Sequence, residues 1–165
     1  MRRPRRPDAD AAEADERTVR TAALALLAGR DFGRAELARR LQQRGYPAGV
    51  VTAVVEGLVA ERLLSDSRFV EQFIRQRAGR GHGPVRIRAE LRNLAVSDTE
   101  VEAGLEAAAV DWAAVAREVR RRRFGVSPPG DYPERARQAR FLQYRGFTNE
   151  QIRAAPGPGE DIDDP

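Results

Sequence analysis

The sequence has 165 residues, of which 41% are apolar and 33% are charged, and its formal net charge is +4. All 29 basic residues are arginine, so every cationic side-chain contact is made by a guanidinium fork. No cysteine occurs, which excludes disulfides, thiolate zinc sites and cysteine nucleophiles. Because no apolar run approaches the length of a membrane span and the N-terminus lacks a secretory signal, we expect a soluble, cytoplasmic protein.

The two ends of the chain lack an apolar face. Residues 1–15 combine four arginines and two prolines with a run of acids, which predicts a disordered arm with a basic tip. Residues 156–165 are rich in proline, glycine and acids, which predicts a flexible acidic tail. We therefore expect an ordered body over residues 16–155.

Within this body, apolar residues recur with helical spacing, and glycine, proline or capping residues separate the segments. No segment alternates with the period of a β-strand, so the predicted fold class is all-α. Two helix starts carry a capping box, at Ser97–Glu100 and Thr148–Gln151. Nine helices are predicted. Four have both bounds assigned: Val19 to Ala28, Arg34 to Arg44, about Asp111 to Arg123 and about Pro133 to Arg145. For the other five only the start is assigned: at Pro47, after Ser65, at Pro84, after Ser97 and after Thr148.

An internal repeat organises these helices. The segment Arg34–Tyr46 aligns with Arg135–Phe147, and Arg, Ala, Leu, Gln, Arg, Gly and an aromatic residue recur in register. A fainter copy spans Ile87–Val96, where Ala95 stands in the place of the turn glycine. Each copy holds the end of one helix, a sharp turn and a second helix, so one more helix before each pair gives three-helix units. We predict three tandem helix-turn-helix-like repeats that form an elongated, curved body, over residues 16–62, 63–109 and 110–155.

The segment Arg75–Leu91 holds five arginines and the only histidine of the chain around a Gly-Pro step. A general base needs an oriented partner, and a zinc site needs three or four ligands, so a lone histidine points to neither. A phosphate-binding loop needs a lysine and a preceding strand, and both are lacking. We interpret His82 as an exposed residue at a turn tip, expect no metal and no cofactor, and predict a binding protein rather than an enzyme.

Several runs of arginine lie on the predicted helices, and together they favour the binding of a polyanion or an acidic protein surface. Aromatic residues are not interleaved with them as a base-stacking platform requires, so contacts with phosphates or with protein are favoured over base readout. The alternative is a helix-turn-helix protein that reads duplex DNA, although Val50–Val59 is almost uncharged. The candidate contact residues are Arg75, Arg77, Arg80, Arg86, Arg88, Arg92, Arg120, Arg121, Arg122, Arg123, Arg135, Arg137 and Arg140.

Four stretches of the chain, in order, resemble the RecX family of bacterial proteins, which regulate the recombinase RecA. Two departures concern local turns and caps: Ala95 replaces a turn glycine, and a single acid stands between Ser65 and Ser67 where paired acids are usual. The four stretches are Arg34–Leu41 with Arg44–Tyr46, Leu64–Arg75, Gly83–Leu91 and Arg140–Phe147.

The resemblance implies an all-α body of three-helix repeats and a role in DNA repair, recombination and the SOS response. It implies a non-enzyme that binds in the groove of the filament of RecA on single-stranded DNA, where it inhibits the ATPase, strand exchange and filament growth. Separately, no long heptad repeat indicates a coiled-coil dimer, and we expect a monomer. The candidate arginines would then contact RecA, and single-stranded DNA weakly or through the filament. Capping, groove bridging and disassembly all stay open as modes of action.

Overall fold

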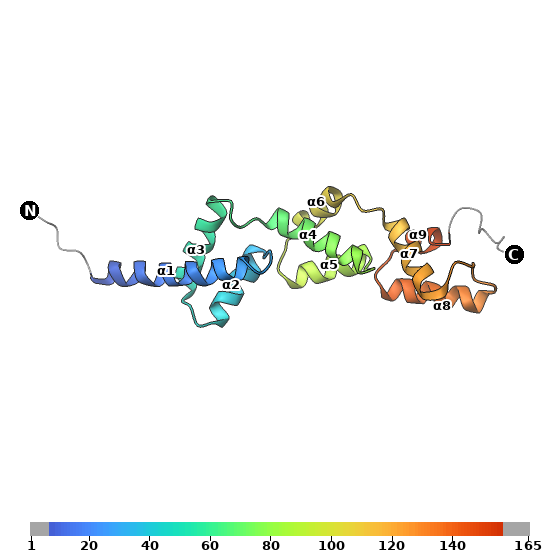
Figure 1. The fold of residues 1–165 in the computed structure, drawn as a ribbon, viewed down its shortest axis with the longest axis horizontal. Coiled ribbons are helices and arrows are strands. Elements are labelled where there is room, and N and C mark those ends of the chain that lie inside the picture. The colour runs from blue at the N-terminus through green and yellow to red at the C-terminus, as the bar shows by residue number, and fades with distance from the viewer. Residues whose placement is uncertain (1–6, 157–165) are drawn as a thin grey trace, which may run out of the picture. The chain divides into compact units, whose positions relative to one another are not determined.

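The structure is a computed structural model that describes residues 7–156, and the predicted basic tip at residues 1–6 and the tail at 157–165 lie outside the described residues. All regular secondary structure over residues 7–156 is α-helical, which confirms the predicted fold class (Figure 1). No helix in this range is both long and apolar enough to cross a membrane. The helices are α1 (Pro7–Leu27), α2 (Arg34–Gln43), α3 (Ala48–Ala60), α4 (Asp66–Gly79), α5 (Pro84–Asn93), α6 (Asp98–Ala108), α7 (Trp112–Phe124), α8 (Tyr132–Tyr144) and α9 (Asn149–Ala154).

Helix α1 starts much earlier than the sequence predicts, at Pro7 instead of Val19. Disorder is predicted for residues 1–15 because they lack an apolar face. Such a face is needed for packing against other helices and not for helix formation. Residues 8–14 are rich in alanine, which has the highest helix propensity, and proline is favoured in a first helical turn. The structure therefore differs from the prediction over residues 7–15.

Both predicted capping boxes are present. The backbone N–H of Glu100 donates to Ser97 Oγ at 3.3 Å, and the backbone N–H of Ser97 donates to Glu100 Oε2 at 3.1 Å. The same reciprocal pair joins Thr148 and Gln151, at 3.3 and 2.9 Å. Each box satisfies amide groups at a helix start that have no partner within the helix, and so it fixes where α6 and α9 begin.

The chain divides into two compact units. The first comprises the chain up to Phe69 together with Leu94–Val96, and it contains the first three-helix repeat, α1–α3. The second comprises Val70–Asn93 and the chain from Ser97 onward, so α5 and α6 share one unit with the third repeat, α7–α9. Helix α4 begins in the first unit and continues into the second.

The first repeat is held together by an apolar core to which all three of its helices contribute. Each fully buried leucine in such a core contributes about 1.5–3 kcal/mol through removal of apolar surface from water. At the edge of this core an ion pair of 2.6 Å joins Arg20 of α1 to Glu61, just after α3. The buried residues of the core are Val19, Ala23, Phe32, Leu37, Leu41, Val51, Val54, Val55, Leu58 and Leu64.

In the second unit, α6 approaches α4 closely at Gly104. A Cβ atom at this position would lie 2.4 Å from Cγ1 of Val70 and 3.2 Å from Cδ1 of Ile74, so a larger residue would push the two helices apart. Ile87 and Leu91 of α5 are fully buried in the same unit, as the helical spacing predicts. Small and large residues thus interlock in the second repeat.

The third repeat combines a small apolar core with one buried cation. Ala116, Leu142 and Phe147 are buried, but so is Arg120, whose exposed fraction is only 2%. Arg120 Nε donates to Oε1 of Gln138 at 2.9 Å, and a terminal nitrogen donates to the carbonyl oxygen of Ser127. Arg120 therefore crosses the repeat from α7 to α8 and to the loop between them.

The aligned turns of the three repeats share a left-handed backbone. The φ angles are +91° at Gly45, +60° at Ala95 and +90° at Gly146. Glycine adopts such angles without a steric penalty, whereas alanine is strained there. The predicted correspondence of Ala95 with the two glycines is thus visible in the backbone itself.

The Gly-rich segment before α5 makes a backbone contact with the turn after α8, within the second unit. The N–H of Gly83 donates to the carbonyl oxygen of Arg145 at 2.8 Å, and the N–H of Val85 donates to the carbonyl oxygen of Gly146 at 3.0 Å. A Cβ atom at Gly83 would lie 2.3 Å from the oxygen of Gly146, so only glycine allows this approach. The segment joins the second repeat to the third.

Candidate anion-binding surface

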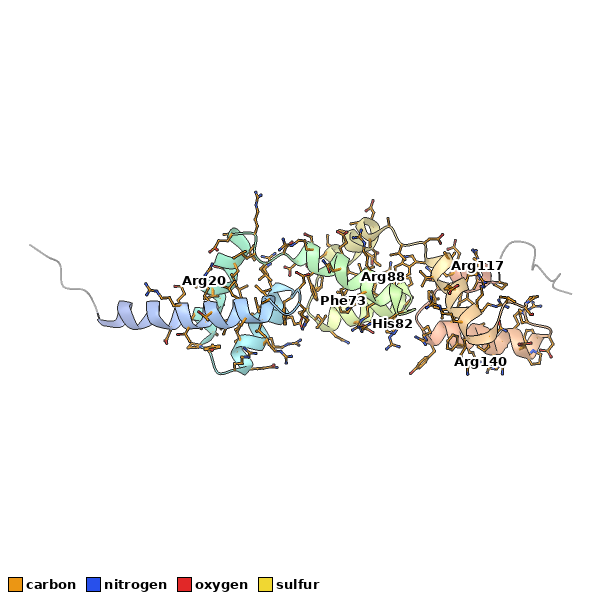
Figure 2. All side chains as sticks on the ribbon, viewed as in Figure 1. Arg20, Phe73, His82, Arg88, Arg117 and Arg140 are labelled. Atoms are coloured by element: carbon orange, nitrogen blue, oxygen red, sulfur yellow. The ribbon has the colours of Figure 1, made fainter. Side chains whose placement is uncertain are left out.

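His82 lies inside this junction and not at an exposed tip, so the predicted exposure is wrong. Only 14% of its side chain is exposed, and its Nδ1 atom lies 3.8 Å from Oε1 of Glu90 (Figure 2). Burial, followed by the charge of Arg86, holds the pKa of His82 below its ordinary value. Over the described residues, no group of three or more His, Asp and Glu side chains is placed to hold a metal ion.

The arginines of α5, together with Arg77 at the end of α4, make ion pairs within the second unit. Glu90 receives two of them, with Arg77 Nε at 2.6 Å and Arg86 Nε at 3.0 Å. Arg88 Nε lies 2.7 Å from Glu102, and this hydrogen bond raises the pKa of Arg88 and lowers the pKa of Glu102. Arg92 pairs in the same way with Asp98, at 2.6 Å.

Three further candidate arginines pair with acids of their own helices. The distances are 2.7 Å from Arg75 to Glu71, 2.8 Å from Arg122 to Glu118 and 3.7 Å from Arg137 to Glu134. These side chains are largely exposed, and ion pairs of this kind contribute about 0–1 kcal/mol because water and salt screen them. A partner that carries negative charge competes with these intramolecular carboxylates for the guanidinium groups.

Arg120 is removed from the candidate set, because its guanidinium group is buried between α7 and α8 and bonded there. The remaining candidates make no ion pair with a carboxylate of residues 15–156, the part of the chain whose side chains the structure describes. Most lie on α7 and α8, and Figure 2 marks Arg140 on the latter helix. These unpaired candidates are Arg80, Arg121, Arg123, Arg135 and Arg140.

A cleft of about 300 Å³ gathers four arginines within the second unit. Arg145 is one of them, and the sequence-based set omits it because its place in the repeat motif suggested a helix end and no more. Its guanidinium carbon lies 5.4 Å from the centre of the Phe141 ring. The residues that line this arginine cleft are Gly79, Arg80, Gly81, Val119, Arg122, Arg123, Phe141 and Arg145.

Exposed aromatic residues accompany the arginines of α8, contrary to the expectation that aromatics are not interleaved with them. Tyr144 is 82% exposed and Tyr132 is 77% exposed. Tyr144 follows Arg140 by four positions, so the two side chains share one face of the helix. An exposed aromatic ring beside a cation is the combination that contacts unstacked bases.

Comparison with known proteins identifies the family. Models of the first, second and third three-helix domains of RecX match residues 20–58, 65–105 and 110–155, in chain order. The chain belongs to the RecX family. The regulatory protein RecX of Halorhodospira halophila is 50% identical over 153 residues, which cover 93% of this chain and 95% of that protein. RecX of Pseudomonas savastanoi pv. phaseolicola is 44% identical over 144 residues, which cover 87% and 93% of the two chains.

Solved RecX structures have the same fold. The crystal structure of RecX from Lactobacillus salivarius matches with a TM-score of 0.74 at 18% identity, over 87% of this chain and 95% of that one. A second crystal structure of a regulatory protein RecX matches with a TM-score of 0.73 at 17% identity, over 94% and 80%. The chain is therefore a RecX-type regulatory protein with the three-helix repeats of its family.

Proposed function

We propose that this protein is a negative modulator of RecA that binds the groove of the RecA filament on single-stranded DNA. Binding there lowers the ATPase activity of RecA, strand exchange and filament growth. The protein acts by binding and not by catalysis. Membership of the RecX family supports the regulatory role, and the name of that family points to RecA as the partner.

The observation that carries the proposal is the set of guanidinium groups without an acidic partner on the second unit. Five of the predicted arginines have no ion pair with a side chain of residues 15–156, and Arg145 adds a sixth. A guanidinium group without an acidic partner among the described side chains suits carboxylates or phosphates of a binding partner. Their position on α7, α8 and the end of α4 makes the second unit the principal docking surface.

Inhibition follows from binding to one filament geometry more tightly than to another. A ligand shifts a conformational equilibrium only by its difference in affinity for the two states. A chain that bridges neighbouring RecA subunits favours the geometry that it fits and opposes the motions of turnover. Several modest contacts along one chain add up because each contact raises the effective concentration of the next.

Direct reading of duplex DNA is the competing function. In the first and second repeats the third helix does not suit it, because α3 carries no basic residue and α6 has acids in its first turn. A recognition helix in the major groove presents donors and cations to base edges and phosphates. Sequence-selective binding to duplex DNA without RecA would therefore contradict the proposal.

Co-sedimentation with RecA filaments on single-stranded DNA tests the docking surface. A variant with Arg121, Arg123, Arg135 and Arg140 changed to alanine is compared with one in which Arg75, Arg88, Arg92 and Arg137 are changed. Both variants lose four positive charges, but the second set is paired with acids. We expect the first variant to lose at least about tenfold in filament affinity and the second much less. Equal losses would show that net charge, and not the unpaired surface, determines binding.

A further inference from the structure

We propose that the arginine cleft holds a phosphodiester group of single-stranded nucleic acid, with the adjoining nucleoside against its apolar floor. This inference rests on the proposed function, because it names the component of the nucleoprotein filament that the cleft would meet. The cleft lies wholly within the second unit, between the turn after α4 and the helices α7 and α8.

The charge of the cleft is the first argument. Four arginines line one concave surface, and among the described residues only Arg122 of these four has a carboxylate partner, Glu118 at 2.8 Å. Arg80 and Arg123 make no ion pair with any described residue, and Arg145 donates only to the carbonyl oxygen of Arg80, at 3.5 Å.

The number of donors favours phosphate over carboxylate. Each guanidinium group presents five N–H donors in a fixed planar arrangement. A carboxylate holds its two acceptor oxygens in one plane and matches one or two such groups, whereas the tetrahedral phosphorus of a phosphodiester spreads its oxygens in three dimensions. Arg80, Arg123 and Arg145 come from three different segments, and donors on separate segments suit an acceptor whose oxygens do not lie in one plane.

The apolar floor and the size of the cleft favour a single strand. Val119 and Phe141 form the apolar part of the cleft lining, its floor, and an apolar surface next to cations suits a sugar or an unstacked base. A volume of about 300 Å³ is at the lower end of small-molecule sites, which is the scale of one nucleotide and not of a duplex. Gly79 leaves the rim open, since a Cβ atom there would meet nothing within 4 Å.

Fluorescence anisotropy with a labelled oligothymidylate, without RecA, tests the assignment on the full chain. The test variant carries Arg80→Glu and Arg123→Glu, and the control carries Arg39→Glu and Arg40→Glu on exposed positions of α2. The two variants have the same net charge. We expect the cleft variant to bind about tenfold more weakly and to lose about 0.7 or more from the slope of log affinity against log salt, and the control to keep the native slope.

A second variant separates the geometry of the donors from charge and from folding. Arg80→Lys with Arg123→Lys keeps both charges but removes the planar forks, so we expect affinity between those of the native chain and the glutamate variant. Its helix content, measured by circular dichroism, must equal that of the native chain. An oligonucleotide with abasic sites should bind more weakly than oligothymidylate if a base contacts the floor.

The outcomes distinguish this inference from the proposed function. If the glutamate variant and the control bind oligothymidylate equally, the cleft does not hold a phosphodiester. If the glutamate variant keeps oligothymidylate affinity but no longer binds the filament, the cleft meets an acidic side chain of RecA, which overturns the inference and leaves the regulatory function intact. If oligothymidylate binding depends on the cleft while the native chain leaves RecA turnover unchanged, the inference stands and the proposed function is wrong.

Discussion

The turn of the first repeat and the turn of the third repeat have the same backbone conformation but different surroundings. Gly45 and Gly146 both have φ near +90°. A Cβ atom on Gly45 would meet nothing within 4 Å, whereas one on Gly146 would lie 2.4 Å from Cβ of Arg86. In the first repeat the glycine only allows the chain to turn, and in the third it also packs directly against the first turn of α5. An identical local motif is therefore used both as a plain turn and as a contact between repeats.

The cores of the first and third repeats differ as well, in the chemical type of the side chains that they bury. The buried core of the first repeat is apolar, whereas the third repeat buries Arg120 and Gln138 together. A buried pair of this kind needs complete hydrogen bonding, because an unsatisfied buried polar group costs about 1–3 kcal/mol. The third repeat thus depends on specific polar geometry where the first depends on apolar area.

The largest effect that this comparison predicts is that of Gly146→Ala. The substitution adds left-handed strain and a clash with Arg86, so the free energy of unfolding should fall by about 2–5 kcal/mol. Gly45→Ala is the matched control, since it adds the same strain without a clash and should cost about 1–2 kcal/mol. Urea unfolding of the two variants measures the difference, and equal losses would mean that the contact between α5 and the third repeat adds no stability.

The next effect in size concerns the buried cation. Arg120→Met keeps most of the side-chain volume but removes the bonds to Gln138 and Ser127, and we expect a loss of about 1–3 kcal/mol in unfolding free energy. Arg121→Met, at the exposed next position of α7, should stay within about 0.5 kcal/mol of the native chain. A loss at position 121 as large as that at position 120 would contradict a specific role for the buried pair.

A smaller effect of opposite sign is expected at the middle copy of the turn. Ala95 has φ of +60°, so Ala95→Gly should raise the free energy of unfolding by about 0.5–1 kcal/mol through relief of strain. Ala103→Gly, at an exposed interior position of α6, should lower it by about 0.5–1 kcal/mol. Thermal melting of both variants shows whether each change raises or lowers stability. A loss of stability for Ala95→Gly would contradict the interpretation that Ala95 is strained in the turn.

The smallest predicted effect is the pH dependence of the junction at His82. Its pKa is lowered in the folded protein by burial and by Arg86, Arg77 and Arg145, against the opposing charge of Glu90. The stability that neutral His82 provides is therefore complete above its unfolded pKa of about 6.5 and is lost as the pH falls from there through the folded pKa. Melting temperatures across this range should fall more steeply for the native chain than for His82→Gln. Parallel curves would mean that the pKa of His82 is the same in the folded and the unfolded chain.

The sequence predicts the helices well because their signals are local. Capping boxes at Ser97 and Thr148 and prolines at Pro47 and Pro84 mark helix starts with their own side chains or ring geometry. The start of α1 at Pro7 is not predicted, since the prediction requires an apolar face and an alanine-rich helix forms without one. The repeat aligns Ala95 with the two turn glycines, and the structure shows that Ala95 shares their positive φ.

The site is harder to predict because pairing and burial depend on tertiary contacts. Arg120 and Arg121 are adjacent in one run of arginines, yet one is buried and the other exposed. Arg88 lies on α5 and Arg145 directly follows α8, yet Glu102 pairs with the first, whereas the second lines the cleft. The Gly-rich segment around His82 could not be recognised as a junction, since its partner at Gly146 lies far away along the chain.

The most direct test of the account is the ATP turnover of RecA on single-stranded DNA as the native protein is titrated in. We predict that turnover falls in a saturable manner, and that the variant of the four unpaired arginines, Arg121, Arg123, Arg135 and Arg140, requires at least about tenfold more protein for the same inhibition. Unchanged turnover at saturating native protein would contradict the central claim that this chain is a negative modulator of RecA.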